Sequence, residues 1–245
     1  MIEDLPGWIN IVFLLTVGVT VLMFYYANGS RKEILTGLII WSASQSFLAL
    51  NGFYLITDTF PPRFILVLLP TTILIIISLL PTYRAKLSKD RNRTVSTFLH
   101  TVRIPVEIIL FYLFINKMVP ELMTFEGRNF DILAGLTAPI VGTLILTRRA
   151  SNGLLISWNV ISLVLVCFIM INGILSSELP FQQFGFEQPN KAMLYFPFIL
   201  LPAVIVPIVI HTHLTELVIL IKERNTAYNN ANGLLGKQAH KDIHA

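Results

Sequence analysis

The chain has 245 residues, of which 54% are hydrophobic and only 13% are charged, and its mean hydropathy is +0.70. Soluble domains contain about 25% charged residues, so this composition excludes an ordinary globular protein and predicts a bundle of membrane helices. The net charge of +4 comes from basic residues dispersed over short loops, which argues against a nucleic-acid partner, and the single Cys167 excludes a disulfide within the chain.

Seven apolar stretches are long enough to cross the lipid bilayer, whose core of about 30 Å needs roughly 20 helical residues. They lack the period-two alternation of membrane strands, so each is predicted to be a helix. The predicted spans are Trp8–Tyr26, Ile34–Ile56, Phe64–Leu80, Phe98–Met118, Phe130–Leu146, Leu154–Leu175 and Leu194–Leu220. Because Glu3 and Asp4 make the start acidic and no cleavage site follows, we expect the first helix to be retained.

Lysine and arginine are distributed unequally between alternate loops, thirteen in one set and four in the other. The richer set is Arg31, Lys32, Arg84, Lys86, Lys89, Arg91, Arg93, Arg148, Arg149, Lys222, Arg224, Lys237 and Lys241. Basic loops are retained in the cytoplasm. The sequence therefore predicts an amino terminus outside and a carboxyl terminus inside, in the plasma membrane, which for a bacterium is the inner membrane.

The predicted fold class is all-α, a polytopic membrane bundle of seven transmembrane helices. Connections are short, so neighbouring helices are expected to pack as antiparallel pairs within one transmembrane domain, residues 1–222. Residues 223–245 are expected to be a polar cytoplasmic tail that frays from the last helix.

Three ionisable residues in the fourth span share one helical face. His100, Arg103 and Glu107 lie at positions i, i+3 and i+7. Arg103 and Glu107 are one turn apart, so they are expected to neutralise each other, either as a structural ion pair near the cytoplasmic end or as part of a proton or ion relay. Pro105 lies between them, and its missing N–H frees the carbonyl of Thr101.

The last span adds His211, His213 and Glu216 at the same predicted depth. His211 and His213 point about 200° apart on a regular helix, whereas His213 and Glu216 share a face. A metal site of His100, Glu107, His213 and Glu216 is compatible with the ligand types. Histidines facing lipid headgroups are the alternative, and the sequence assigns no metal or other cofactor.

The outer loop before the fifth span is rich in charge and hydrogen-bonding groups, with Glu121, Glu126, Arg128, Asn129 and Asp131. Two interpretations remain open: a lid folded back over the mouth of the bundle, or a solvated loop whose Asn129 or Asp131 caps the next helix. Asn51 and Asn172, at the outer ends of the second and sixth spans, are candidates for a polar vestibule beneath the lid.

The last span also carries Pro197, Pro202 and Pro207 at five-residue intervals. Each proline removes a backbone hydrogen bond, so this helix is predicted to be bent or locally unwound and is a candidate hinge. Broken helices line substrate paths in transporters, although prolines are also common in membrane helices without such a role.

Two segments carry a resemblance to a known family. Pro105-Val106-Glu107, together with residues 123–131, resembles an uncharacterised family of bacterial seven-helix integral membrane proteins. The resemblance implies a membrane bundle and no particular activity.

Three function classes remain. The leading hypothesis is a non-enzymatic bundle that binds or transports a small solute or ion, with the outer loop as its mouth and the face of Arg103 and Glu107 as an inner gate. The first alternative is a membrane-embedded hydrolase that acts on a lipid-like substrate with His100, His213 and Glu216. The second is a sensor or assembly subunit whose partner is another membrane protein or a second copy of the chain.

Overall fold

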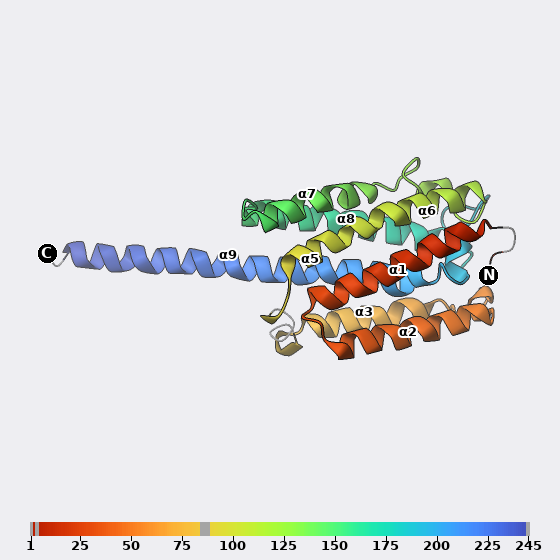
Figure 1. Ribbon diagram of the computed structural model, residues 1–245, viewed down its shortest axis with the longest axis horizontal. Helices are drawn as coiled ribbons and strands as arrows, with labels where there is room; N and C mark the ends of the chain where they lie inside the picture. The colour runs from red at the N-terminus through yellow and green to blue at the C-terminus, as the bar shows by residue number, and fades with distance from the viewer. Residues whose placement is uncertain (1, 3–4, 84–88, 244–245) are drawn as a thin grey trace.

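The computed structural model describes residues 2, 5–83 and 89–243, and the described residues are helical with no strand (Figure 1). The α-helices are α1 Gly7–Ala27, α2 Lys32–Leu50, α3 Ile65–Leu79, α5 Arg93–Phe98, α6 Arg103–Ile115, α7 Ile132–Leu146, α8 Asn152–Leu175 and α9 Val206–Ile243. Short 3₁₀ segments are η1 Phe53–Leu55, η2 Leu99–Val102, η3 Glu121–Met123 and η4 Ala192–Leu194, and η5, Leu201–Ile205, is a π-helix.

Five helical segments within the described residues are long and apolar enough to cross a membrane. They are Gly7–Ala27, Lys32–Leu50, Arg93–Ile115, Asn152–Leu175 and Leu201–Thr226. The other two predicted spans coincide with the apolar helices α3 and α7, which have 15 residues each and therefore a length of about 22 Å. The all-α class is thus confirmed for the described residues, and the five apolar helices support a membrane protein. The finer count of seven spans rests on the two shorter helices.

The outward faces of the helices are apolar. Phe47 on α2 and Leu146 on α7 are each 67% exposed, and similar side chains line the outside of α1, α3 and α8. A water-soluble protein rarely exposes contiguous apolar surface on this scale. The exposed apolar side chains therefore favour lipid as the surrounding medium.

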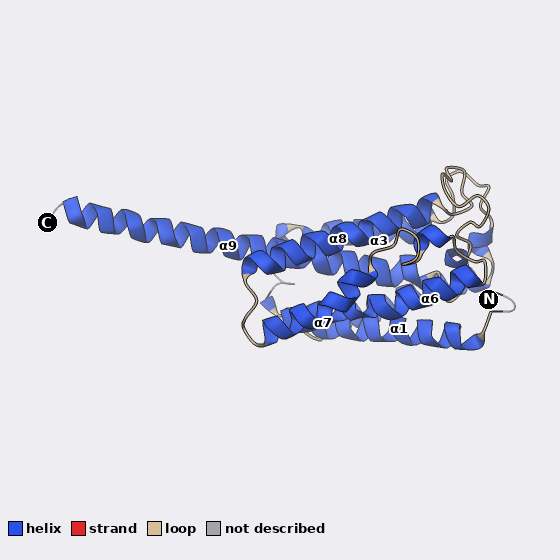
Figure 2. Ribbon diagram, turned by 90° about the horizontal axis from the view of Figure 1, so that it is seen from above, coloured by secondary structure: helices blue, strands red, loops and turns tan. Residues whose placement is uncertain are grey.

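Helix α9 is the centre of the bundle. It packs against α8 and α3, while α1 contacts α2, α5 and α6. In Figure 1, α2 and α3 lie on one side of α9, and α6, α7 and α8 lie on the other. Figure 2 shows that the long loops gather at the end where α1 begins, whereas α9 leaves the bundle at the opposite end.

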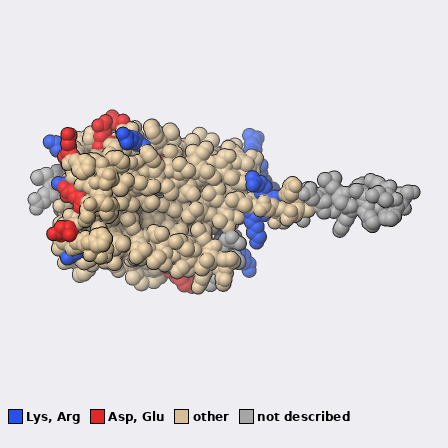
Figure 3. Space-filling view, turned by 180° about the vertical axis from the view of Figure 1, so that it is seen from behind, with Lys and Arg blue, Asp and Glu red and all other residues tan. Residues whose placement is uncertain are grey.

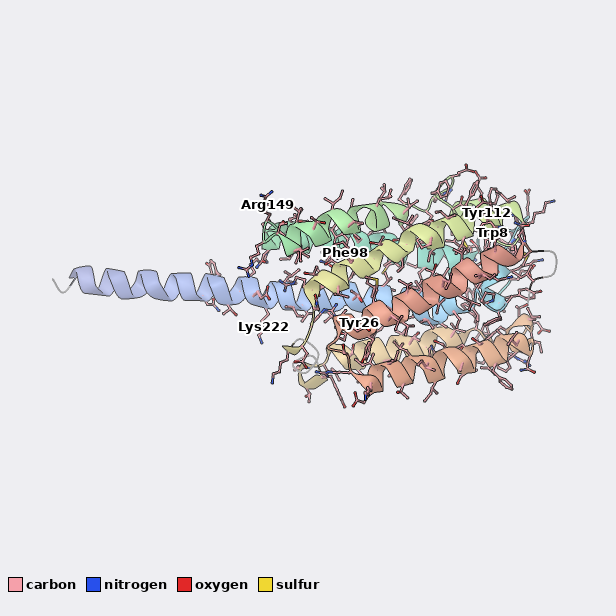
Figure 4. The ribbon with its side chains drawn as sticks, viewed as in Figure 1. Trp8, Tyr26, Phe98, Tyr112, Arg149 and Lys222 are labelled. Atoms are coloured by element: carbon pink, nitrogen blue, oxygen red, sulfur yellow. The ribbon has the colours of Figure 1, made fainter. Side chains whose placement is uncertain are left out.

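Charged and aromatic side chains divide between the two ends. Lys and Arg form a band where α9 leaves the bundle, most Asp and Glu lie toward the other end, and the surface between is largely uncharged (Figure 3). Arg149 and Lys222 belong to the first end, and Trp8 and Tyr112 lie at the second (Figure 4). Arg84, Lys86, Glu3 and Asp4, which the sequence-based orientation also uses, lie outside the described residues.

The fourth span is interrupted by the 3₁₀ segment η2, which joins α5 to α6. Pro105 lies in the first turn of α6 and cannot donate to the carbonyl of Thr101 in η2. The tighter 3₁₀ backbone immediately before α6 agrees with the predicted local distortion.

The last span begins later than predicted. Pro197 precedes the helix, because residues 192–199 form η4 and turns, while Pro202 lies in the π-helix η5 and Pro207 in the first turn of α9. In α-helical register the N–H of residue 207 would donate to the carbonyl of Ala203, and proline has no such N–H. The indole Nε1 of Trp41 donates to that carbonyl instead, at 2.9 Å.

Helix α9 also ends later than expected, since it continues to Ile243 without a break where the sequence suggested a fraying tail after Lys222. Residues 231–241 contain Ala, Leu, Lys and Gln, which are strong helix formers, and these outweigh the intervening Gly and Asn.

Replacing Trp41 with Phe is expected to leave the Ala203 carbonyl without a donor. An unsatisfied buried polar group costs about 1–3 kcal/mol, so the free energy of unfolding in detergent should fall by that amount. In a Pro207→Ala background the restored backbone N–H takes over the carbonyl, and Trp41→Phe should then cost less than half as much. Equal costs in both backgrounds, measured by denaturant titration, would show that the indole bond does not compensate for the proline.

Candidate functional site

Arg103 is the centre of a buried polar cluster in the middle of the bundle. Its guanidinium lies 2.9 Å from Asp131 Oδ1 as an ion pair, donates to the carbonyl of Ser162 at 3.3 Å, and contacts His213 Nε2 at 2.7 Å. These partners come from the start of α7, from α8 and from α9. A single side chain of α6 therefore joins four helices, and only 3% of this side chain is exposed.

The hydrogen bonds of His213 determine its protonation. The ring atom Nδ1 lies 2.8 Å from Asn159 Oδ1, while Asn159 Nδ2 donates to the carbonyl of Leu155 at 2.8 Å. The amide oxygen can only accept, so Nδ1 carries the hydrogen and Nε2 offers its lone pair to Arg103. His213 is accordingly a neutral imidazole that supports the guanidinium.

The structure brings His100 and His213 together, as the composite of the fourth and last spans predicted. The two rings stack at 3.9 Å between centroids with 13° between their planes, and Trp158 presents its edge at 5.4 Å and 5.5 Å. The Nδ1 atom of His100 is buried and has no hydrogen-bond partner among the described residues. The pair is packed inside the protein rather than exposed at a membrane surface.

Glu107 does not pair with Arg103, contrary to the sequence-based expectation. Among the described residues its carboxylate is held by Asn129 alone, whose Nδ2 lies 2.6 Å and 2.7 Å from the two oxygens. The same nitrogen also donates to the carbonyl of Met123 at 3.0 Å. One amide nitrogen has two hydrogens for these three oxygens, so the buried Glu107 carboxylate keeps unused acceptor capacity. No Lys, Arg or His of the part of the chain that the structure describes forms an ion pair with it.

Asp131 takes the place predicted for Glu107 because the outer loop folds inward. Asn129 and Asp131 are both buried, and Asn129 Oδ1 accepts from the backbone N–H of Asp131 at 3.0 Å. The side chain of Asp131 makes no cap to α7 and points to Arg103 instead. Helix α7 can come this close because a Cβ at Gly135 would lie only 3.1 Å from the Cβ of Arg103.

The remaining outer-loop candidates stay outside the cluster. Glu121, Glu126 and Arg128 are exposed. Asn51 is exposed as well, and Asn172, although buried, donates back to the carbonyl of residue 168 in its own helix. The predicted vestibule is therefore not formed by these two asparagines.

A cavity of about 80 Å³ lies beside the cluster and is lined by residues of α3, α6, α8, η5 and α9. Arg103, Glu107 and Asp131 are on its wall, and most of the remaining wall is apolar. Asn190, from the loop before η4, also lines it. Asn190 donates to the carbonyl of Gly173 at 3.0 Å, while its Oδ1 is buried without a partner among the described residues.

A second polar cluster closes the end of the bundle where α9 leaves. Glu216 on α9 accepts from Arg91 at 2.5 Å and from Arg93 at 3.1 Å. Arg91 also donates to Asn28 at 3.0 Å, and Arg93 to Glu223 at 2.9 Å. The sequence places Arg91 and Arg93 in a basic loop, and in the structure both side chains contact residues of the bundle.

This second cluster separates Glu216 from the histidines. Glu216 is committed to two arginines, Glu107 to Asn129, and His211 points to the ring of Phe24 at 5.3 Å. No group of three or more His, Cys, Asp or Glu among the described residues is arranged to hold a metal ion. The four-ligand metal site is therefore not assembled among the described residues.

Sequence reasoning missed two residues of the site. Asn190 lies in an irregular loop beside Lys191, where nothing in the local pattern distinguishes a cavity-lining amide from a solvated one. Arg91 precedes Asn92, which caps α5, and was grouped with the other loop cations. Only the path of the chain reveals that it turns inward.

Comparison with known proteins identifies a family and no nearer relative. A family model described as "Domain of unknown function (DUF8737)" matches residues 59–221, more than half of the chain. No curated protein and no solved structure matches. The matched segment contains the whole cavity wall and both clusters except Asn28 and Glu223.

The different pairing of the two buried carboxylates has a measurable consequence. Asp131→Asn removes the ionic partner of a buried guanidinium, which costs about 3–5 kcal/mol, so its free energy of unfolding in detergent should fall by that amount. Glu107→Gln removes a carboxylate that has no cationic partner among the described residues. Its free energy of unfolding should therefore equal or exceed that of the unmodified protein. An equal loss in both variants would contradict the pairing described here.

Proposed function

Because the chain belongs to the family "Domain of unknown function (DUF8737)", we propose a function for the segment that this family covers. The protein is a seven-span membrane protein of the plasma membrane, the inner membrane in a bacterium. Its amino terminus is outside and its carboxyl terminus is cytoplasmic. Its bundle binds a small solute or ion in the cavity beside Glu107 and passes it along the polar axis.

The observation that carries this proposal is the position of Glu107. A carboxylate that is 1% exposed, has no cationic partner among the described residues and lines a cavity is costly to maintain inside apolar helices. Such a group persists in a membrane bundle where a ligand, ion or proton complements it. A purely structural role would be better served by the closed pairing seen at Asp131.

The topology has separate support. Phe64 and Leu80 flank α3 and Phe130 precedes α7, so apolar residues extend both short helices toward the bilayer surfaces. The basic band where α9 leaves the bundle follows the rule that cytoplasmic ends carry the excess of Lys and Arg. Trp8 and Tyr112, whose rings meet at 4.7 Å, resemble the aromatic belt of a membrane interface at the other end.

The polar groups also suggest a route. From the cytoplasmic end, the ion pair of Arg91 and Glu216 is followed by His213 one turn earlier on α9, then by Arg103, and then by Glu107 at the cavity. The ion pair of Arg91 and Glu216 is the inner gate of this route.

A sensor is the second candidate, and α9 favours it. The same helix carries His213 beside the cavity cluster and then continues out of the bundle to Ile243. A ligand that changes the packing of this helix would move its protruding end. Uptake into proteoliposomes of a solute that the protein binds, lost in Glu107→Gln, supports passage, whereas binding without uptake supports the sensor.

Labelling of introduced cysteines tests the topology. In a Cys167→Ser background, Glu126→Cys in the outer loop should react with a membrane-impermeant maleimide added to intact cells. Tyr228→Cys, 67% exposed on the protruding part of α9, should react only after permeabilisation. Labelling of both from the same side would contradict the three spans proposed between these two positions.

Native mass spectrometry tests occupancy of the cavity without assuming a ligand. The full-length protein is incubated with the small-molecule extract of the cells that produce it. We expect a non-covalent adduct that Gly173→Leu abolishes, because Gly173 lines the cavity and its added side chain grows toward Met123, 3.2 Å from the new Cβ.

The matched control is Gly37→Leu on α2, where an added Cβ has no neighbour within 4 Å. This variant should keep the adduct. An absence of adducts on the unmodified protein, or equal adducts on Gly173→Leu, would overturn binding in the cavity.

A further inference from the structure

The charges on the cavity wall do not balance. Arg103 contributes one positive charge, and Asp131, 2.9 Å away, already neutralises it. Glu107 adds a second carboxylate whose described partner is the neutral amide of Asn129. His213, which also touches Arg103, is held neutral by its hydrogen bonds. The wall therefore carries one negative charge in excess whenever Glu107 is ionised, and a bound cation favours that ionised form.

The same wall also carries hydrogen-bond acceptors with capacity that no donor within the described residues uses, and a cation with N–H groups could donate to them. The Glu107 carboxylate has unused lone pairs, and Asn190, only 2% exposed, offers a buried Oδ1 with no partner among the described residues. Both groups lie next to Met123. On one side, the Met123 carbonyl and Glu107 both accept from the side-chain amide of Asn129. On the other side, the Met123 side chain lies close to Gly173, and the Gly173 carbonyl accepts from Asn190. Two acceptors thus flank one methionine at the cavity.

The rest of the wall is apolar and deformable. Leu110, Val166 and Ile169 present aliphatic surface, and Met123, Met170 and Met193 add flexible thioethers. A volume of about 80 Å³ limits an occupant to a small molecule. A fully hydrated inorganic ion would find few polar partners on such a wall.

We propose that the cavity binds a small organic ammonium cation, whose N–H groups donate to Glu107 and Asn190 and whose hydrocarbon part lies among the methionine and aliphatic side chains. This inference rests on the proposed function and specifies its ligand. A charged hydrogen bond to a carboxylate that has no other cation explains why Glu107 is kept apart from Arg103.

Calorimetric titration of the full-length protein with n-butylammonium tests the proposal, with n-butanol and butyrate as matched neutral and anionic probes. One buried charge-assisted contact of about 1.4 kcal/mol corresponds to a tenfold change in affinity. We therefore expect butylammonium to bind at least about tenfold more tightly than butanol, and butyrate not to bind.

Variants separate the contributions of the two acceptors. Glu107→Gln should weaken butylammonium binding about tenfold or more, and Asn190→Leu should weaken it several-fold, since a neutral hydrogen bond contributes less than a charged one. Glu121→Gln, an exposed carboxylate of the outer loop, should leave the affinity unchanged. The unfolding curve of each variant, recorded in parallel, identifies any loss of affinity caused by misfolding.

Two results would overturn the ammonium assignment. One is butanol or butyrate binding as tightly as butylammonium, and the other is a folded Glu107→Gln variant with unchanged affinity. Neutral or anionic adducts from the cell extract that are lost in Gly173→Leu would reject the ammonium ligand and leave the proposed binding function intact. Binding of no probe and no extract component would reject both.

Discussion

The buried ion pair of Arg103 and Asp131 is the contact on which the arrangement of the bundle depends. A guanidinium in the interior of a membrane protein requires a partner, because an unpaired charge there costs several kcal/mol. To supply this partner, the outer loop must turn inward and α7 must approach α6, which Gly135 permits. The histidine and asparagine that complete the cluster then fix the positions of α8 and α9.

Helix α9 reaches these contacts along a distorted path. Pro202 and Pro207 remove backbone donors where the helix begins, the backbone adopts a π-helix, and Trp41 satisfies the carbonyl of Ala203. Two turns farther along, His213 meets the Arg103 cluster, and Glu216 meets the arginines near the exit. The π-helix η5 borders the cavity, and α9, which follows it, is held near the exit by the contacts of Glu216. Any displacement at the cavity is thereby connected to a helix that leaves the bundle.

The positions of the helices could be predicted from the sequence because each depends on a local property, a continuous run of apolar residues. The predicted ends differ from the observed ones at the start of the last span, where prolines act, and most of all at its end, where α9 continues to Ile243. Pairing in the site could not be predicted in the same way. Glu107 is one turn from Arg103 in sequence, yet Asp131, 28 residues away, is its partner. That choice depends on the fold of an irregular loop, which has no periodicity to interpret.

The two clusters differ in the one property that matters for ligand binding. At the exit of α9, Arg91 and Arg93 face Glu216 and Glu223, so the charges match and every carboxylate has a cation. At the cavity there are two carboxyl groups and one guanidinium, which pairs with Asp131, so Glu107 has no cationic partner among the described residues. A balanced buried cluster holds helices together and has no charge left for a ligand. His100 and His213 are prominent in the sequence, but both are buried, and His213 is held neutral by its hydrogen bonds. Glu107, a buried carboxyl group with no cationic partner among the described residues, lies on the cavity wall, and the proposed binding of a solute depends on it.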